Sequence, residues 1–438
     1  MSCRRGPWPW QALVHVCQRW RRIIFTWPLH LDVRLDCNPT KTDVANLLDV
    51  WPTLPISLES RFISNGDGII NKLKHRDRIV RIKLRNLTGI QLEKCAILTQ
   101  ESFPFLRSLH LSLHPDADDY PMPENFFSGS IPRLRKLTLM AIQFPTLPKL
   151  LLSARDLVTL HLGDVTSTEY ISPDTIAPCL STLTKLQLLR IDFLFQGLFS
   201  NSRNPSRPLQ ALQTRALLPS LSVLMFEGVS EYSEDLMSRI DAPVLDRMLL
   251  AFFYHPTFDI PELPQFLHRS KVFKPLSKVK VSFCKDALII TLFPSSDSGY
   301  FSLEIPCTGL HRQLSFLNHF FTQTVCLPLL SHVCQLRLFG DDQELDQGDP
   351  MQNLRFLRSF HDVQVLDISG SPRQDYLEIY IARVLGELTR ESAAEVLPMM
   401  HTLMLSSYGC HQVRNLVTTL LKPFIDARQL SGQPVEVR

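Results

Sequence analysis

The chain has 438 residues, of which 45% are apolar and 20% charged, as expected for a folded protein with two or three domains or one elongated array. Its net charge of +3 does not favour nucleic acid or a membrane as a partner, and no run of about 18 uncharged apolar residues predicts a membrane-spanning helix. The ten cysteines are scattered without a CxxC pair, so we expect reduced thiols, a location in the cytoplasm or nucleus, and no metal site or cofactor.

The first predicted element is a helix over "LVHVCQRWRRII", residues 13–24. Its apolar residues recur at intervals of three and four, so they form one face. This face consists of Leu13, Val16, Cys17, Trp20, Ile23 and Ile24. Arginines occupy the other sides, and Pro28 ends the helix. Such a helix either caps the array that follows, with a solvated basic side, or contacts a partner.

A six-residue pattern then recurs eleven times: an apolar residue, two others, an apolar residue, one other and an apolar residue. It begins at residues 79, 106, 134, 157, 186, 221, 245, 276, 333, 363 and 400. Two shorter segments, "LDVRL" at 31 and "ISLES" at 56, extend the series upstream. The usual interval of about 25–35 residues is that of leucine-rich repeats.

The repeated pattern predicts a strand at each occurrence. The last two apolar residues point to one side of the strand, and the first packs in the turn that enters it. Four intervening segments are suited to helices or irregular returns: 147–154, 312–324, 351–362 and 376–396. We therefore expect an α/β fold, a leucine-rich-repeat-like solenoid with parallel strands. The alternative is a globular α/β domain with many buried strands.

The residue between the last two apolar positions should point away from the core of the array. These residues are the candidate target-binding face: His110, Thr138, His161, Arg190, Met225, Leu249, Lys280, Arg337, Asp367 and Met404. Their mixed polar, basic and apolar character does not identify a ligand.

The interval of 57 residues after the repeat at 276 is twice the usual one. It contains "ALIITLFPSSDSGYFSLEI", residues 287–305, in which two strand-like runs flank a turn rich in serine. This composition predicts a β-hairpin inserted in the array. The alternative is a pair of ordinary repeats that lost their leucines.

The last predicted element is an amphipathic helix over residues 411–432. Val413, Leu416, Leu420 and Phe424 lie at helical spacing, and Gly432 is suited to ending the helix. We expect this helix to cap the array. The chain then divides into a helical segment (1–30), the repeat array (31–410) and the capping helix with its tail (411–438).

The opening segment "LVHVCQRWRRIIFTWPLHLDVRL" (13–35) resembles the second half of an F-box. Together with "LLDVWPTLPISL" (47–58), the repeats and the ending "FIDARQLSGQPVEV" (424–437), it is similar to fungal, chiefly mushroom-type, F-box proteins with divergent leucine-rich repeats. The resemblance implies a substrate receptor of a Skp–cullin–F-box ubiquitin ligase. In such a receptor the apolar face of the first helix contributes to binding the Skp-type adaptor, and the repeats bind an unknown protein target.

The chain departs from this family at its beginning, where "MSCRRGPWPW" stands in place of the first half of an F-box. Either the sequence begins late, or the receptor has lost adaptor binding and the helix only caps the array.

Local motifs of catalysis and phosphate binding, such as G-x-S-x-G, H-E-x-x-H and the P-loop, do not occur in the sequence. The stretch "KLKHRDRIVRIKLR" (72–85) is basic, but it lacks the interleaved aromatic residues of a nucleic-acid surface and reads as a solvated edge. We therefore expect a non-enzymatic interaction module. An enzyme whose site is assembled from distant residues is the less favoured alternative.

Overall fold

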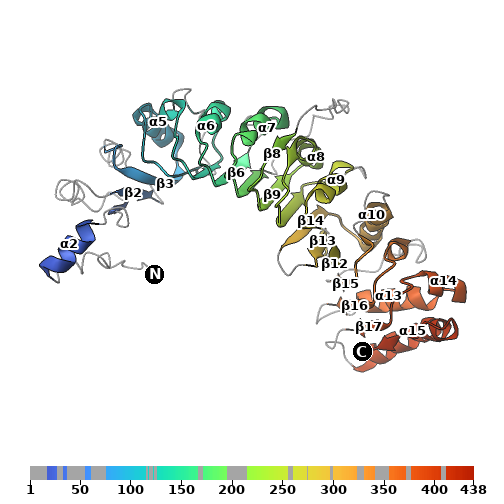
Figure 1. Cartoon of the computed structure of the whole chain (residues 1–438). Coiled ribbons are helices and arrows are strands. Elements are labelled where there is room, and N and C mark those ends of the chain that lie inside the picture. The colour runs from blue at the N-terminus through green and yellow to red at the C-terminus, as the bar shows by residue number, and fades with distance from the viewer. Residues whose placement is uncertain are drawn as a thin grey trace. The chain divides into compact units, whose positions relative to one another are not determined.

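The computed structural model describes residues 17–26, 33–36, 55–60, 75–114, 117, 122, 126–165, 171–194, 215–254, 260–273, 275–295, 299–322, 330–340, 355–370, 376–405 and 411–438. It is an α/β structure in which strands and helices alternate along the chain (Figure 1). Two compact units are present. Unit 1 consists of Met1–Ile171 and Pro178–Ser202, and unit 2 of Ser172–Ala177 and Arg203–Arg438. The expected α/β class is confirmed.

The strands of unit 1 form a parallel sheet in which each strand pairs with the next one in the sequence. They are β1 (Val33–Asp36), β2 (Ile56–Ser60), β3 (Ile79–Leu87), β4 (Ser108–Leu113), β5 (Lys136–Met140), β6 (Thr159–Val165) and β7 (Leu188–Phe193). The helical segments between or beside them are α2 (Gln18–Thr26), α5 (Gly89–Leu98), the 3₁₀ helix η2 (Phe126–Gly129), α6 (Leu147–Ser153) and α7 (Pro173–Ser181), whose first turn belongs to unit 2. Every repeat predicted in this part of the chain therefore contains a strand.

Side-chain burial in the repeated pattern follows the alternation that its spacing predicts. In β4, Leu109 and Leu111 are buried while His110 is only partly so, and the leading Leu106 is fully buried in the turn before the strand. That turn is closed by the backbone N–H of Leu106, which donates to the carbonyl of Phe103 at 3.2 Å. Phe103 is itself buried, and equivalent turns precede β5 and β6. An apolar residue three positions before each of these patterns thus belongs to the repeat.

Three strands of unit 1 have a residue in the left-handed backbone conformation next to their last residue, at the same place in the repeat. These are Asn86, Ala141 and Asp164, with φ of 53°, 53° and 52°. Asparagine and aspartate adopt this conformation readily, whereas alanine does so at a cost. The backbone N–H of Asn86 also donates to Ser112 Oγ at 3.2 Å, which joins the end of β3 to β4. The backbone turns at this position of the repeat, but the three residues found there are of different types, so the sequence does not reveal the turn.

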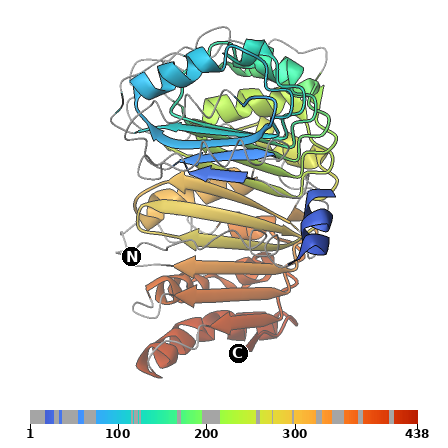
Figure 2. The same ribbon diagram turned by 90° about the vertical axis from the view of Figure 1, so that its left-hand side faces the viewer.

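Most strands of unit 2 follow the order β9-β11-β14-β13-β12-β15-β16-β17-β18. They are β9 (Val223–Gly228), β11 (Arg247–Phe252), β12 (Leu276–Phe283), β13 (Ala287–Pro294), β14 (Tyr300–Pro306), β15 (Gln335–Gly340), β16 (Val365–Gly370), β17 (Thr402–Leu405) and β18 (Glu436–Val437). A short parallel pair is formed by β8 (Ala216–Leu217) and β10 (Ile240–Asp241). Figure 2 shows the strands face on.

The helices of unit 2 lie between successive strands of the chain. They are α8 (Ser230–Arg239), α9 (Glu262–Arg269), α10 (Leu310–Thr322), the 3₁₀ helix η4 (Arg355–Ser359), α13 (Tyr376–Gly386), α14 (Arg390–Glu395) and α15 (His411–Leu430). Three of the four segments expected to return between strands are α-helical, and the one at 351–362 contains η4 instead. The expected single return at 376–396 is divided into α13 and α14.

The hairpin expected at 287–305 is present as β13 and β14, which pair antiparallel. The sequence did not predict where it sits. β13 also pairs antiparallel with β12, while β14 pairs parallel with β11, so the hairpin lies between two strands that precede it in the chain. Gln313 in α10 holds this arrangement together. Its buried Nε2 donates to the carbonyls of Cys307 (2.6 Å), Cys284 (2.8 Å) and Ala287 (3.3 Å).

The expected C-terminal helix is present, and Gly432 follows its end with φ of 74°. Its predicted apolar face is wrong in phase. Leu416 is 47% exposed, and the buried positions are Val417, Leu421, Phe424 and Arg428. Of the predicted face only Phe424 is fully buried, Leu420 is partly exposed, and the side chain of Val413 lies outside the described residues. The tail then adds β18 beside β17, a parallel strand that the sequence did not predict.

Arg428 shares the buried side of α15 with Val417, Leu421 and Phe424, and it is fully buried without a carboxylate partner among the described residues. Its Nη2 donates to the carbonyls of Met400 (2.7 Å) and Pro398 (3.2 Å), and its Nη1 donates to Gln433 Oε1 (2.7 Å). Burial lowers the pKa of this guanidinium below its usual value. Because a charged residue lies on the buried side of the helix, the apolar spacing in the sequence does not identify that side.

Within the described ranges, none of the helices combines the length and the apolar character needed to cross a membrane.

Candidate functional site

The predicted target-facing residues of unit 1 lie in one row across the sheet. Residue by residue, Lys83 on β3 pairs with His110, then Thr138, His161 and Arg190 on the strands that follow. All of them are partly exposed, while the leucines on either side are buried. We call the outward-pointing side chains of β2–β7 the unit 1 face. The sequence did not include Lys83 among its candidates, although it occupies the equivalent position of its own repeat.

An ion-paired cluster lies at the β6–β7 end of this face. Asp192 Oδ2 accepts hydrogen bonds from Arg190 Nε at 2.6 Å and from His161 Nε2 at 2.8 Å. The carboxylate side chain is 11% exposed and that of His161 19%. Because an ionised carboxylate only accepts hydrogen bonds, His161 Nε2 is the donor in this contact. The sequence predicted His161 and Arg190 as candidates but not the acid that joins them.

His110 occupies the middle of the same face. Burial lowers the pKa of His110 to about 4, and the positive charges of Arg85, Lys83 and His161 act in the same direction. The imidazole is therefore neutral near pH 7. The shift of the His110 pKa records mainly partial removal from water, to which the neighbouring positive charges add.

The predicted residues of unit 2 also lie in one row. Met225 is in register with Leu249, and on the far side of the hairpin Lys280, Arg337, Asp367 and Met404 follow on successive strands. The hairpin inserts Ser302 and Thr291 between Leu249 and Lys280. These two residues carry no leucine-repeat signal, so the sequence could not assign them to the row. We call the outward-pointing side chains of β9–β17 the unit 2 face.

The unit 2 face mixes aromatic side chains with charges of both signs. Lys280 Nζ lies 5.6 Å from the ring centre of Phe339, and Lys278 Nζ lies 5.9 Å from that of Phe293. Arg337 Nε is 3.2 Å from Asp367 Oδ2, so that pair is locally neutral. Partly exposed aromatic rings beside basic groups are common in protein-binding surfaces.

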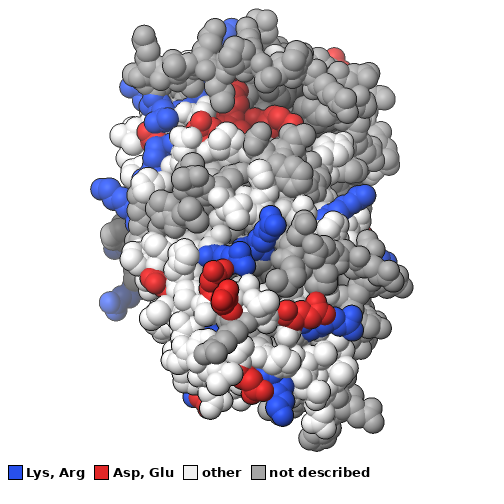
Figure 3. Space-filling view, turned by 90° about the vertical axis from the view of Figure 1, so that its right-hand side faces the viewer, with Lys and Arg blue, Asp and Glu red and all other residues white. Residues whose placement is uncertain are grey.

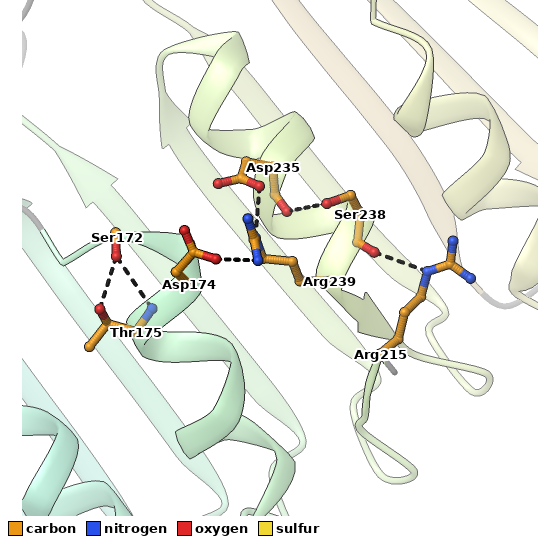
Figure 4. A network of polar contacts seen from close by, with 7 residues as sticks. All are labelled: Ser172, Asp174, Thr175, Arg215, Asp235, Ser238 and Arg239. Carbon is orange, nitrogen blue, oxygen red and sulfur yellow. Dashed lines mark hydrogen bonds and ion pairs between the residues drawn. The ribbon is translucent and has the colours of Figure 1, made fainter. Parts of the chain in front are cut away.

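A polar network in unit 2 joins the first turn of α7 to α8 (Figure 4). Arg239 forms ion pairs with Asp174 on α7 and, through Nε at 2.7 Å, with Asp235 one turn earlier on its own helix. Ser238 Oγ donates to the carbonyl of Asp235 at 2.7 Å, and the carbonyl of Ser238 accepts from Arg215 Nε at 2.9 Å. The contacts fix helices relative to each other within unit 2, which is a structural role.

Glu234 on α8 is the acid with the largest shift among the described residues. Burial raises its pKa to about 7, although the backbone N–H groups of Glu262 and Leu263 donate to Oε2 (2.7 Å) and Oε1 (3.1 Å) and oppose the shift. Both carboxylate oxygens are thus used to cap α9, a stabilising contact with a helix N-terminus. Glu234 lies in unit 2 and His110, the other residue with a large pKa shift, lies in unit 1. The described residues contain no group of His, Cys, Asp and Glu able to hold a metal ion.

The predicted adaptor-binding helix is present as α2. Cys17 and Trp20 are exposed, the Trp20 side chain to 46%, and every other side chain described there is exposed as well. Leu13 and Val16 lie outside the described residues, as do the side chains of Ile23 and Ile24. Among the side chains described on α2, Trp20 is therefore an exposed aromatic residue.

Charged groups elsewhere on the surface are interspersed with uncharged side chains. Figure 3 shows small acidic and basic groups next to one another on the face drawn there.

No family model matches the chain, and the search of curated proteins gave no match either.

Proposed function

We propose that this protein is a non-enzymatic receptor that binds other proteins through the outward faces of its strands. The observation that carries the proposal is the register of the two rows. Positions that the repeat leaves free of core packing stand side by side on successive strands, from Lys83 to Arg190 in unit 1 and from Met225 to Met404 in unit 2. Such a surface offers many adjustable contacts on a rigid scaffold.

The architecture fits a divergent leucine-rich-repeat solenoid, with the C-terminal helix α15 as its cap. A strand, a return and a parallel neighbouring strand follow one another through unit 1 and resume after the hairpin in unit 2. Charged and polar residues vary at the outward positions while the inward leucines persist. This division of roles is what a repeat protein with a broad target surface requires.

We further propose that the protein is the substrate receptor of a Skp–cullin–F-box ubiquitin ligase in the cytoplasm or nucleus. The support is the F-box-like segment at 13–35 together with the exposure of Trp20 on α2. An exposed tryptophan is a suitable anchor, because aromatic residues contribute much of the energy at protein interfaces. Catalysis of ubiquitin transfer then belongs to other subunits.

The test is binding of the full chain to a fungal Skp-type adaptor, measured by titration calorimetry. We expect Trp20→Ala to weaken binding at least about tenfold, since truncation of an aromatic anchor costs about 2 kcal/mol or more. The matched control is Gln18→Ala, an exposed neighbour on the same helix, which should bind as the wild type does. If the wild type does not bind the adaptor, the ligase proposal is wrong, and the protein-binding role of the strand faces has to be tested by itself.

A further inference from the structure

The unit 1 face carries more basic than acidic side chains. Its Lys and Arg residues come from β3, β5 and β7, and its acidic residues come from β2 and β7. The basic ones are Arg81, Lys83, Arg85, Lys136 and Arg190, and the acidic ones are Glu59 and Asp192. The chain as a whole is nearly neutral, so this excess is a local property of the sheet face.

Both acidic groups already have partners. Glu59 Oε1 lies 4.0 Å from Arg81 Nη1, and Asp192 Oδ2 accepts from Arg190 and His161. Within the described residues, Lys83, Arg85 and Lys136 make no hydrogen bond or ion pair through their side chains. Arg190 bonds Asp192 through Nε, which leaves its two terminal nitrogens for another acceptor. The face therefore has cationic groups that its own acids do not neutralise.

His110 gives a second sign of this excess. It lies between Lys83 and Thr138 in the row, and it stays neutral near pH 7 because of burial and the cations around it. A ligand that brings negative charge to this face relieves the repulsion among these cations.

We propose that the unit 1 face binds an extended acidic segment of a target protein that runs across strands β3 to β7. The inference rests on the proposed function, because it names the chemistry of the target that such a receptor takes. Arg81 and Lys136 lie in one row, two strand spacings or about 9.6 Å apart, and Lys83 and Arg190 lie in the next row, four strand spacings or about 19 Å apart. Every third residue of a polyproline II segment points to the same side, about 9.3 Å further along, so acidic residues at that interval match the spacing of Arg81 and Lys136, and twice that interval matches the spacing of Lys83 and Arg190.

The composition of the face favours a polypeptide over single-stranded nucleic acid. Its described outward positions contain no Phe, Tyr or Trp on which bases could stack, and between the cations it offers Thr138 and Met140. Hydroxyl and thioether groups suit the small or apolar side chains between the acidic residues of a peptide.

The experiment measures binding of fluorescein-labelled peptides to the full chain by fluorescence anisotropy at low ionic strength. One peptide carries glutamate at every third position among serine and alanine, and a second has the same composition with its glutamates adjacent. We expect the spaced peptide to bind at least about threefold more tightly than the clustered one, and added salt to weaken both. The double variant Lys83→Glu/Lys136→Glu should weaken the spaced peptide at least about tenfold.

The matched control is Lys149→Glu, a charge reversal of an exposed lysine on α6, which should leave binding within about twofold of the wild type. Equal loss in this control, equal affinity for the two peptides, or no binding would overturn the proposal. So would tighter binding of a labelled oligothymidylate through the same two lysines, which would identify a nucleic-acid surface. Trp20→Ala should bind the peptide normally, so failure of adaptor binding and failure of this inference are separate results.

Discussion

At the scale of single residues, the unit 1 face shows how neighbouring groups determine the hydrogen bonding and the charge of a side chain. Asp192 is held by two hydrogen-bond donors, whereas His110 stands among cations and partly out of water. Both lie on strands of the same sheet at outward positions. The difference comes from the neighbours of each residue: Asp192 meets Arg190 on its own strand and His161 on the adjacent one.

His110 should make the protein sensitive to acid. The pKa of an unfolded histidine is near 6.5, and in the folded chain it is about 4, so between these values the unfolded state binds more protons and stability falls as pH falls. His110→Gln removes this contribution, and we expect the loss of unfolding free energy between about pH 7.5 and about pH 4.5 to shrink by about 1–2 kcal/mol. Urea denaturation of both proteins at the two pH values measures it. An unchanged pH dependence would show that His110 is accessible to protons in the folded state.

At the scale of elements, the hairpin is the main departure from a regular array. β13 and β14 separate β11 from β12, and α10 then leads from β14 to β15 beside β12. Gln313 donates to the carbonyls of Cys284 and Cys307, which flank the hairpin, and to that of Ala287, which also accepts from the backbone N–H of Cys284 at 2.9 Å. One amide side chain thus compensates for a break in the strand order.

Replacing Gln313 by leucine, a side chain of similar size, should destabilise unit 2, because the carbonyls of Cys307 and Cys284 lose a hydrogen-bond donor. We expect a loss of about 1–3 kcal/mol in urea denaturation, with faster hydrogen exchange in β13 and β14. His311→Leu, an exposed change on the same helix, should alter the free energy of unfolding by less than about 0.5 kcal/mol. Equal stability of Gln313→Leu and the wild type would mean that water satisfies these carbonyls instead.

At the scale of the whole molecule, contacts join mainly elements that are neighbours in the sheet. In unit 1 strands β1 to β7 pair with one another in chain order, and in unit 2 β15 to β18 do so after the hairpin insertion. Stability in such a structure is the sum of local terms and nearest-neighbour terms. A mutation that destabilises one strand should therefore lower the local stability of that strand and its neighbours more than that of distant strands.

Leu137→Ala tests this locality. Leu137 is fully buried in β5, and its truncation should cost about 2–5 kcal/mol. We expect hydrogen exchange, followed by mass spectrometry, to accelerate in β4, β5 and β6 more than in β2 or in the strands of unit 2. Thr138→Ala, the adjacent outward position, should change protection little. A uniform loss of protection through the chain would contradict the nearest-neighbour description.

Sequence analysis predicted the strands well because each carries the same apolar spacing, and Leu109, Leu137 and Leu160 are buried as that spacing requires. It predicted the outward rows for the same reason. It missed the phase of α15, because a buried arginine interrupts the apolar pattern, and it missed β18, which has only two residues. It could not place Ser302 and Thr291 in the unit 2 row, since their strands lack the repeat.

What the sequence by itself determined is local: which segments form strands, which side of each faces the core, and that a hairpin interrupts the series. These follow from side-chain alternation and turn chemistry over a few residues. Only the tertiary structure decided that the hairpin lies between β11 and β12, that Arg428 is buried among carbonyls, and that Asp192 meets His161 and Arg190 while Lys83, Arg85 and Lys136 remain unpaired within the described residues. Apart from the contact of Arg190 with Asp192 on the same strand, these depend on strand order and on residues distant in sequence, which no local pattern encodes.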